Sequence, residues 1–155
     1  MTTDHDARVS QLGLVLPGPY PPHEPLDAVV VHGGIARTSG QLPRDLDGVI
    51  VQGLVGHDLT VAEAAVAARW CALNALSVLR AELGSLNRIE RVLTVTGFVA
   101  CAQGFDHQPA VIDGASQLLH EVFGEDGRHT RSAIGVSALP RGGAVEIEVT
   151  VALTA

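Results

Sequence analysis

Apolar residues recur every three or four positions in two stretches of the chain, which is the period of an amphipathic helix. The first stretch follows Thr60-Val-Ala-Glu63, where the threonine and glutamate can cap each other's backbone N–H groups, and it stops at Gly84. The second begins near Asp106 and Pro109 and continues to about residue 123. The pattern therefore predicts two helices, each with an apolar face available to cover a sheet.

Strand patterns fill most of the chain between and around these helices. The pair Gly33-Gly34 separates two short apolar runs, as in a tight hairpin, and the last two runs alternate apolar and polar residues around a Leu-Pro turn. We expect the last two runs to pair with each other. The expected strands cover residues 28–32, 35–39, 49–52, 89–101, 131–138 and 145–153.

The predicted order is β-β-β-α-β-α-β-β, an α+β fold with a single sheet and both helices on one face. In the closing pair, alternation predicts that Ile134 and Ile147 face the helices, whereas Arg131, Ala133 and Glu146 lie on the uncovered face. Small and polar side chains such as these leave the sheet face flat and partly apolar, which makes it a poor surface toward water. We therefore expect that face to pack against further copies of the chain.

The first 27 residues have a different composition from the rest of the chain. The run LVLPGPYPPHEP is rich in proline, which fixes the backbone and removes hydrogen-bond donors. We expect residues 1–27 to form an extended arm lying against one domain made of residues 28–155.

Composition excludes several classes of function. The net charge is −7, lysine is absent and only 3% of the residues are aromatic, so we expect no nucleic-acid partner. Histidines and cysteines show no metal-ligand spacing, so we expect no metal. Cys71 and Cys101 lie in apolar segments typical of reduced thiols. The polar start of the chain and the short apolar runs favour a cytoplasmic protein without membrane contact.

Four segments carry a resemblance to a known family. They are TSGQLP (38–43), GHDLTVAEAAVAARWCALNAL (56–76), RIERVLTVTGFV (88–99) and RSAIGVSALPRGGAVEIEV (131–149). In order and spacing the chain resembles the YjgF/RidA family, in a longer branch of it. The resemblance implies a chorismate-mutase-like fold, a homotrimer with its sheets packed in a barrel, and ligand sites in the clefts between subunits.

The resemblance also implies a reaction: hydrolytic deamination of small enamines or imines that carry a carboxylate, giving a 2-oxo acid and ammonia without a cofactor. The family's carboxylate-binding arginine matches Arg131, and its glutamate matches Glu146. Its serine and the following glycine match Ser39 and Gly40. Guanidinium suits this task because it binds a carboxylate through two parallel hydrogen bonds, and a glutamate can position water and shuttle its proton.

Three positions depart from the family's pattern. Leu26 stands at the position of a common tyrosine, with Tyr20 six residues upstream. Ala133 replaces a cysteine, although its backbone N–H remains available to a ligand. Asp113 falls near a helix asparagine, and its charge disfavours an anion placed directly against it. We include Ala133 and Asp113 among the expected substrate-binding residues.

Plainer interpretations remain open for each residue. Arg131 can be an interface ion-pair partner, Glu146 a solvated strand residue and Ser39 the end of a strand. His129 can carry a proton but is also an ordinary loop residue. As an alternative function, the trimer binds small carboxylates without turnover. A hairpin would separate Arg131 from Glu146 by about 20 Å, so one ligand could meet both only across an interface.

Overall fold

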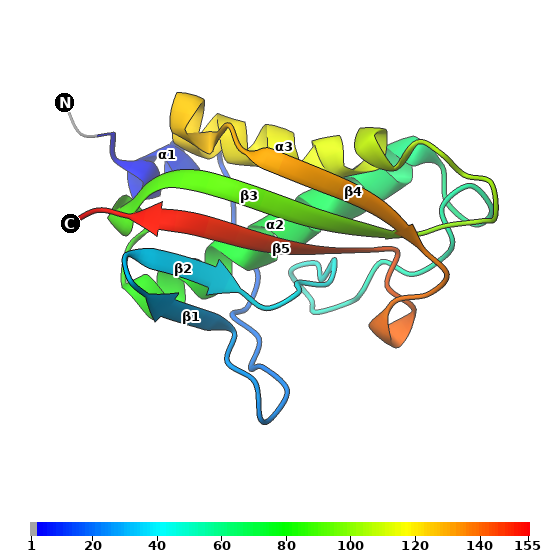
Figure 1. Ribbon diagram of the computed structural model, residues 1–155, viewed down its shortest axis with the longest axis horizontal. Coiled ribbons are helices and arrows are strands. Elements are labelled where there is room, and N and C mark those ends of the chain that lie inside the picture. The colour runs from blue at the N-terminus through cyan, green and yellow to red at the C-terminus, as the bar shows by residue number, and fades with distance from the viewer. Residues whose placement is uncertain (1–2) are drawn as a thin grey trace.

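The computed structural model describes residues 3–155 and contains a five-stranded mixed sheet (Figure 1). In spatial order the strands are β1-β2-β5-β3-β4. Only β3 and β4 run parallel, and the other neighbouring pairs are antiparallel. The strand bounds are β1 Val29–His32, β2 Ile35–Thr38, β3 Ile89–Ala100, β4 Thr130–Val136 and β5 Val145–Leu153.

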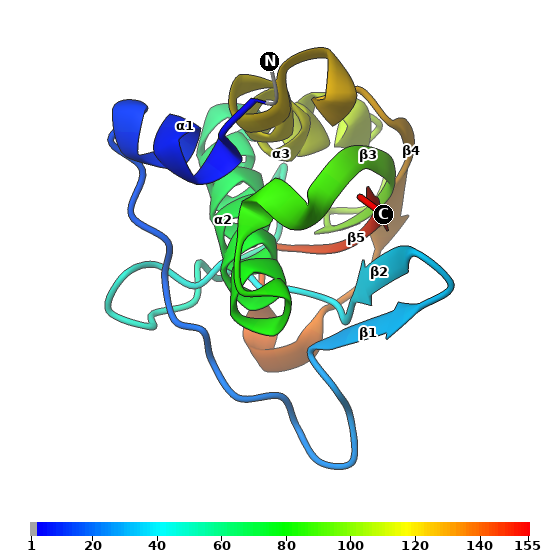
Figure 2. The same ribbon diagram turned by 90° about the vertical axis from the view of Figure 1, so that its left-hand side faces the viewer.

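The two predicted helices are present, as α2 (Val61–Leu83) and α3 (Gln108–Phe123). Both sides of the Thr60–Glu63 capping box are formed, and Gly84 ends α2 in the left-handed conformation. Figure 2 shows both helices on the same face of the sheet. This arrangement confirms the predicted fold class, an α+β fold with a single sheet and both long helices on one face.

α2 is the central helix of the core. Its 23 residues include an unbroken series of buried side chains from Cys71 to Leu79. By length and hydropathy it would qualify as a membrane-spanning helix, but 61% of the apolar window is buried inside the fold. Its composition follows from its position, because it packs against β5 on one side and α3 on the other.

The expected pairing of the last two strands is wrong. β5 lies between β2 and β3, where Glu146 pairs with Phe98, and β4 runs parallel to β3 on its other side. The segment from β3 through α3 to β4 is a crossover, the connection that parallel neighbours require. β5 is therefore a central strand, and every second residue from Val145 to Leu153 is buried.

The predicted orientation of β4 is also wrong. Arg131 bonds to side chains of α3, Ala133 packs against the core, and a Cβ at Gly135 would meet Gln108 of α3. Ile134, expected in the core, keeps 43% of its surface exposed. Both faces of β4 carry small or apolar residues, so alternation alone does not distinguish them. Glu146, by contrast, does lie on the face away from the helices.

Two further differences concern short segments. Residues 49–52 form only isolated bridges, from Ile50 to Arg44 and from Gln52 to Gly143, instead of the expected third strand. Within the arm, His5–Gln11 form a helix, α1, capped by the Asp4 carboxylate. Arg8 of α1 donates to the carbonyl of Glu121 in α3, so this part of the arm packs on the helical layer.

The packing of α2 on α3 generates a stability prediction at Gly114. A Cβ at this position would overlap the backbone carbonyl oxygen of Ala65 in α2. Although alanine favours a helix by about 1 kcal/mol over glycine, we expect Gly114→Ala to destabilise the fold by about 1–3 kcal/mol. Urea unfolding measures this change. Gln117→Ala, at an exposed position of α3, is the control and should change stability by less than about 0.5 kcal/mol. A stabilised Gly114→Ala variant would contradict the close helix contact.

Candidate functional site

The predicted site residues lie in two separate places. Ser39, Gly40 and Glu146 line a cavity of about 660 Å³ near the start of β5, called here the Glu146 cavity. Arg131 and Asp113 lie on the helical side of β4 and form an ion pair of 2.8 Å between Nη1 and Oδ1. A single chain therefore does not combine the expected arginine and glutamate.

Among the predicted site residues, Glu146 has the carboxylate with the fewest bonding partners. Among residues 3–155 its side chain forms neither a hydrogen bond nor an ion pair, whereas Glu148 pairs with Arg37 at 3.3 Å. Burial raises the pKa of Glu146, and the neighbouring charge of Glu148 raises it further. A Cβ at Gly40 would overlap the Glu146 Oε1 atom, so only glycine leaves room for the carboxylate in this position.

The arm forms one wall of the Glu146 cavity. Both Leu26 and Tyr20 line it, so an aromatic side chain is present although the aligned position holds leucine. The Tyr20 hydroxyl donates to the Asp45 carbonyl at 3.1 Å, and the Arg44 guanidinium lies 5.2 Å from the centre of the tyrosine ring. These contacts hold Tyr20, and with it this part of the arm, against the cavity wall.

The other walls add residues that the sequence did not indicate. Arg44, Asn74 and Arg141 also line the cavity. Arg141 has a positive φ of 57°, rare outside glycine, and its carbonyl accepts from Gln52. No spacing rule could have identified these residues, since they come from two loops and a helix. Two arginines therefore border the cavity that contains Glu146.

The hydroxyl and the amide of Ser39 both bond to backbone carbonyl groups. Its hydroxyl donates to the carbonyl of Asp27 at 2.6 Å, and its amide donates to the carbonyl of Ala28 at 2.8 Å. The hydroxyl proton is thus committed to the protein, which leaves only the lone pairs of Oγ for a ligand. Ser39 can accept a hydrogen bond in the cavity but donates none without rearrangement.

Arg131 is held by α3. Its Nη1 donates to Asp113 and, at 3.1 Å, to the Ser116 hydroxyl, while Nη2 lies 3.4 Å from the carbonyl oxygen of Pro109. Only 21% of the arginine side chain is exposed. Asp113 therefore neutralises much of the charge that a ligand carboxylate would use.

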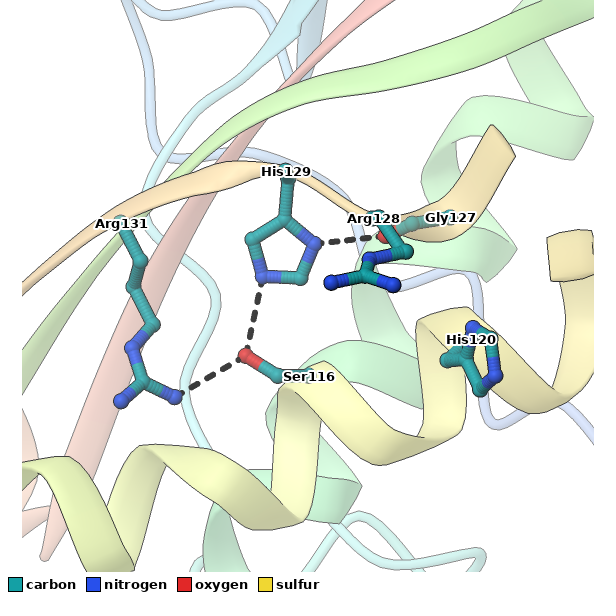
Figure 3. A pocket seen from close by; sticks show the side chains of 6 residues that line it. All are labelled: Ser116, His120, Gly127, Arg128, His129 and Arg131. Atoms are coloured by element: carbon teal, nitrogen blue, oxygen red, sulfur yellow. Dashed lines mark hydrogen bonds between the residues drawn. The ribbon is translucent and has the colours of Figure 1, made fainter. Parts of the chain in front are cut away.

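His129 and Ser116 complete this second cluster, which surrounds a pocket of about 250 Å³ (Figure 3). Ser116 Oγ lies 2.9 Å from His129 Nε2, and His129 Nδ1 lies 2.7 Å from the carbonyl oxygen of Gly127. Burial is the main cause that lowers the pKa of His129, and the nearby Arg131 charge adds to it. His129 is therefore a loop histidine whose two ring nitrogens both have defined partners.

Strand register places the two clusters on opposite faces of the sheet. Along β3, Arg131 is level with Val95 and Glu146 with Phe98, a difference of about 10 Å. β3 itself separates β4 from β5, which adds about two interstrand spacings, or roughly 10 Å. Arg131 and Glu146 are therefore closer together than the predicted hairpin would place them. Because their side chains lie on opposite faces of the sheet, one chain cannot offer both to a small ligand.

The two cysteines and the metal-ligating residue types are the remaining candidates for nucleophilic or metal chemistry. Burial raises the pKa of the Cys71 thiol well above its ordinary value. Cys101 is partly buried beside Gln108 and is a free thiol. Across residues 3–155, no three His, Cys, Asp or Glu side chains come together as potential metal ligands.

Comparison with known proteins identifies one family. A family model described as YjgF/chorismate mutase-like matches residues 6–147. The same description suggests an endoribonuclease activity for the family. The chain is 42% identical over 148 residues to Protein TCP17 of Trypanosoma cruzi, covering 95% of this chain and 92% of that protein.

Solved structures agree with this match. The Agrobacterium tumefaciens protein Atu1372, of unknown function, is 41% identical with a TM-score of 0.88, covering 97% of this chain and 94% of that one. A Shewanella oneidensis protein, whose name proposes an endoribonuclease, is 32% identical with a TM-score of 0.92 and coverages of 97% and 100%. The Escherichia coli protein TdcF, crystallised with bound serine, shares the fold at 21% identity, a TM-score of 0.60 and coverages of 86% and 92%.

The environment of Glu146 predicts how stability depends on pH. Because its folded-state pKa is raised, the protonated form stabilises the fold, and this contribution is lost as pH rises through the raised value. Glu146→Gln removes the charge. The melting temperature of this variant minus that of the wild type should therefore be larger at pH 7.5 than at pH 4, by no more than about 2–4 °C. Thermal unfolding at both pH values measures the difference.

Glu90→Gln is the matched control, since Glu90 is an exposed glutamate on the neighbouring strand β3. Its melting temperature relative to wild type should show no comparable gain at the higher pH. A Glu146→Gln variant whose relative melting temperature stays constant, or falls, between pH 4 and pH 7.5 would contradict the buried, unpaired carboxylate.

Proposed function

The chain belongs to the YjgF/chorismate mutase-like family, and we propose that it hydrolyses small enamines or imines carrying a carboxylate, in clefts between the subunits of a homotrimer. The products are a 2-oxo acid and ammonia. The observation that carries the proposal is Glu146, a partly buried carboxylate with a raised pKa and no partner among residues 3–155, in a cavity of about 660 Å³. This volume is within the range of small-molecule sites.

Glu146 has the properties of a general acid and base. A raised pKa brings its proton affinity closer to neutral pH, where such catalysis is most effective. Its carboxylate can accept a proton from water as the oxygen bonds to the imine carbon, and pass it to nitrogen to give a carbinolamine. It can then take the hydroxyl proton and deliver it to nitrogen as the carbon–nitrogen bond breaks, which leaves the 2-oxo acid and ammonia. The imine is itself an electrophile, so the proposed reaction needs no metal or cofactor.

Arg131 of a neighbouring subunit is the proposed carboxylate anchor. Its guanidinium can fork onto a carboxylate, and Ala133 lies two residues further along the same face of β4. Asp113 at 2.8 Å competes for the guanidinium, but it also offers an acceptor to the nitrogen of an imine or amino group. Ser39 and Gly40 would border the ligand on the Glu146 side.

The open face of the sheet supports assembly. Among the described residues the long helices cover the opposite face (Figure 2), and Val30, Ile134 and the partly buried Phe98 lie on the open one. Apolar side chains on a sheet face favour association between copies. We propose that this face packs in the trimer. Because β4 is an edge strand, Arg131 of the next chain would reach Glu146 past the edge of its own sheet, after leaving Asp113.

A second candidate is a trimer that binds small carboxylates without turnover, because Leu26 and Ala133 stand at the positions of the family's tyrosine and cysteine. Calorimetry with pyruvate distinguishes it, since a pure binder would lose affinity in Arg131→Ala and show no reaction rate. An endoribonuclease function, suggested by the name of the Shewanella relative, fits poorly with a net charge of −7. A cytoplasmic location also stays a prediction.

The catalytic proposal predicts the kinetics of three variants. With 2-aminoacrylate generated in the assay, the wild type should accelerate 2-oxo acid release over buffer. Glu146→Gln should lower kcat by about 10²–10⁴-fold, and Arg131→Lys should mainly raise KM, because lysine lacks the forked geometry. Glu90→Gln is the control and should match the wild type. A wild-type rate equal to buffer at micromolar protein would refute catalysis, and pyruvate binding that depends on Arg131 would then favour the binding module.

A further inference from the structure

Ser116 stands in an unusual environment for a serine in the middle of a helix. Helical serines commonly donate to the carbonyl four residues earlier, as Ser10 of α1 does to Asp6 at 3.3 Å. Ser116 Oγ instead points into the 250 Å³ pocket of Figure 3, where it contacts His129 and Arg131. Its hydroxyl is thus available to chemistry outside the helix.

The hydrogen bonds of this cluster have only one consistent direction. The carbonyl of Gly127 can only accept, so the proton of a neutral His129 sits on Nδ1. His129 Nε2 is then an acceptor, and the Ser116 hydroxyl donates to it across 2.9 Å. Arg131 can only donate, and its Nη1 reaches Ser116 Oγ at 3.1 Å.

These three contacts match the requirements for an activated nucleophile. A serine hydroxyl bonds to a base, the base is oriented by a third group, and a cationic donor lies beside the nucleophilic oxygen. Burial, with the charge of Arg131, keeps the pKa of His129 below its usual range, so the imidazole is neutral near neutral pH and able to take a proton. Arg131 Nη1 donates beside the position where an oxyanion would form, with part of its charge neutralised by Asp113 at 2.8 Å.

We propose that Ser116 and His129 form a nucleophile and general-base pair that takes an acyl group from small activated esters or thioesters. Ser116 Oγ bonds to the acyl carbon while its proton passes to His129 Nε2. The carbon–oxygen or carbon–sulfur bond to the leaving group breaks, and the leaving group takes that proton. Water then attacks the acyl-serine with the same proton path in reverse, which releases the acid and restores the serine.

The lining of the pocket bears on which acyl group it would accept. The Arg128 guanidinium lies on its wall and favours a small, negatively charged substituent. This activity shares Arg131 with the proposed deamination, but it does not use Glu146. Deamination depends on Glu146, which lies on the other face of the sheet.

A fluorophosphonate probe tests the pair directly, because it bonds covalently to serines that have a functioning base. Purified full-length protein should gain the mass of one phosphonyl group, and peptide mapping should place it on Ser116. The wild type should also hydrolyse p-nitrophenyl acetate, and prior phosphonylation should stop that reaction. His129→Gln should slow both reactions by about 10²–10⁴-fold.

Two variants serve as specificity controls. Ser116→Ala should abolish the adduct, with its fold checked by thermal unfolding. Ser10→Ala replaces a helical serine that bonds its own helix and should react like the wild type. Because mapping uses the wild type, the result does not depend on whether a variant folds. Absence of an adduct on wild-type Ser116, or an unchanged rate in His129→Gln, would overturn the proposal.

Discussion

The covering of one sheet face by both long helices is the constraint on which the other features of this protein depend. α2 and α3 approach so closely that Gly114 of α3 has no room for a side chain beside Ala65, and Gly97 of β3 leaves space for Ile112 of α3. This close packing holds α3 over the edge strand β4, where Arg131 meets Asp113 and Ser116. The opposite face retains Glu146 and is left for other contacts.

Local features of the sequence were sufficient to predict the helices, because a cap is built from residues three positions apart. The Thr60–Glu63 box and Gly84 bound α2 where expected. Strand order could not be obtained in the same way, since the insertion of β5 between β2 and β3 depends on contacts between distant segments. The faces of β4 were assigned wrongly because Ala133 and Ile134 are both apolar, so its alternation is ambiguous.

The same distinction applies to the candidate site. Family motifs located Ser39, Gly40 and Glu146, which do line one cavity. They gave no indication of Arg44 or Arg141, which reach that cavity from loops. Nor did any motif indicate Ser116, whose relation to His129 requires β4 to lie against α3. Residues brought together by a crossover have no fixed spacing in sequence, and structure alone reveals them.

The central claim is that Arg131 and Glu146 act on one ligand from different chains, and mixing two inactive variants tests it most directly. Arg131→Ala and Glu146→Gln, co-expressed in equal amounts, should form mixed trimers in which about one quarter of the clefts combine both native residues. Deamination at about one quarter of the wild-type rate would support the claim. Mixed trimers with no more activity than either variant alone would contradict it.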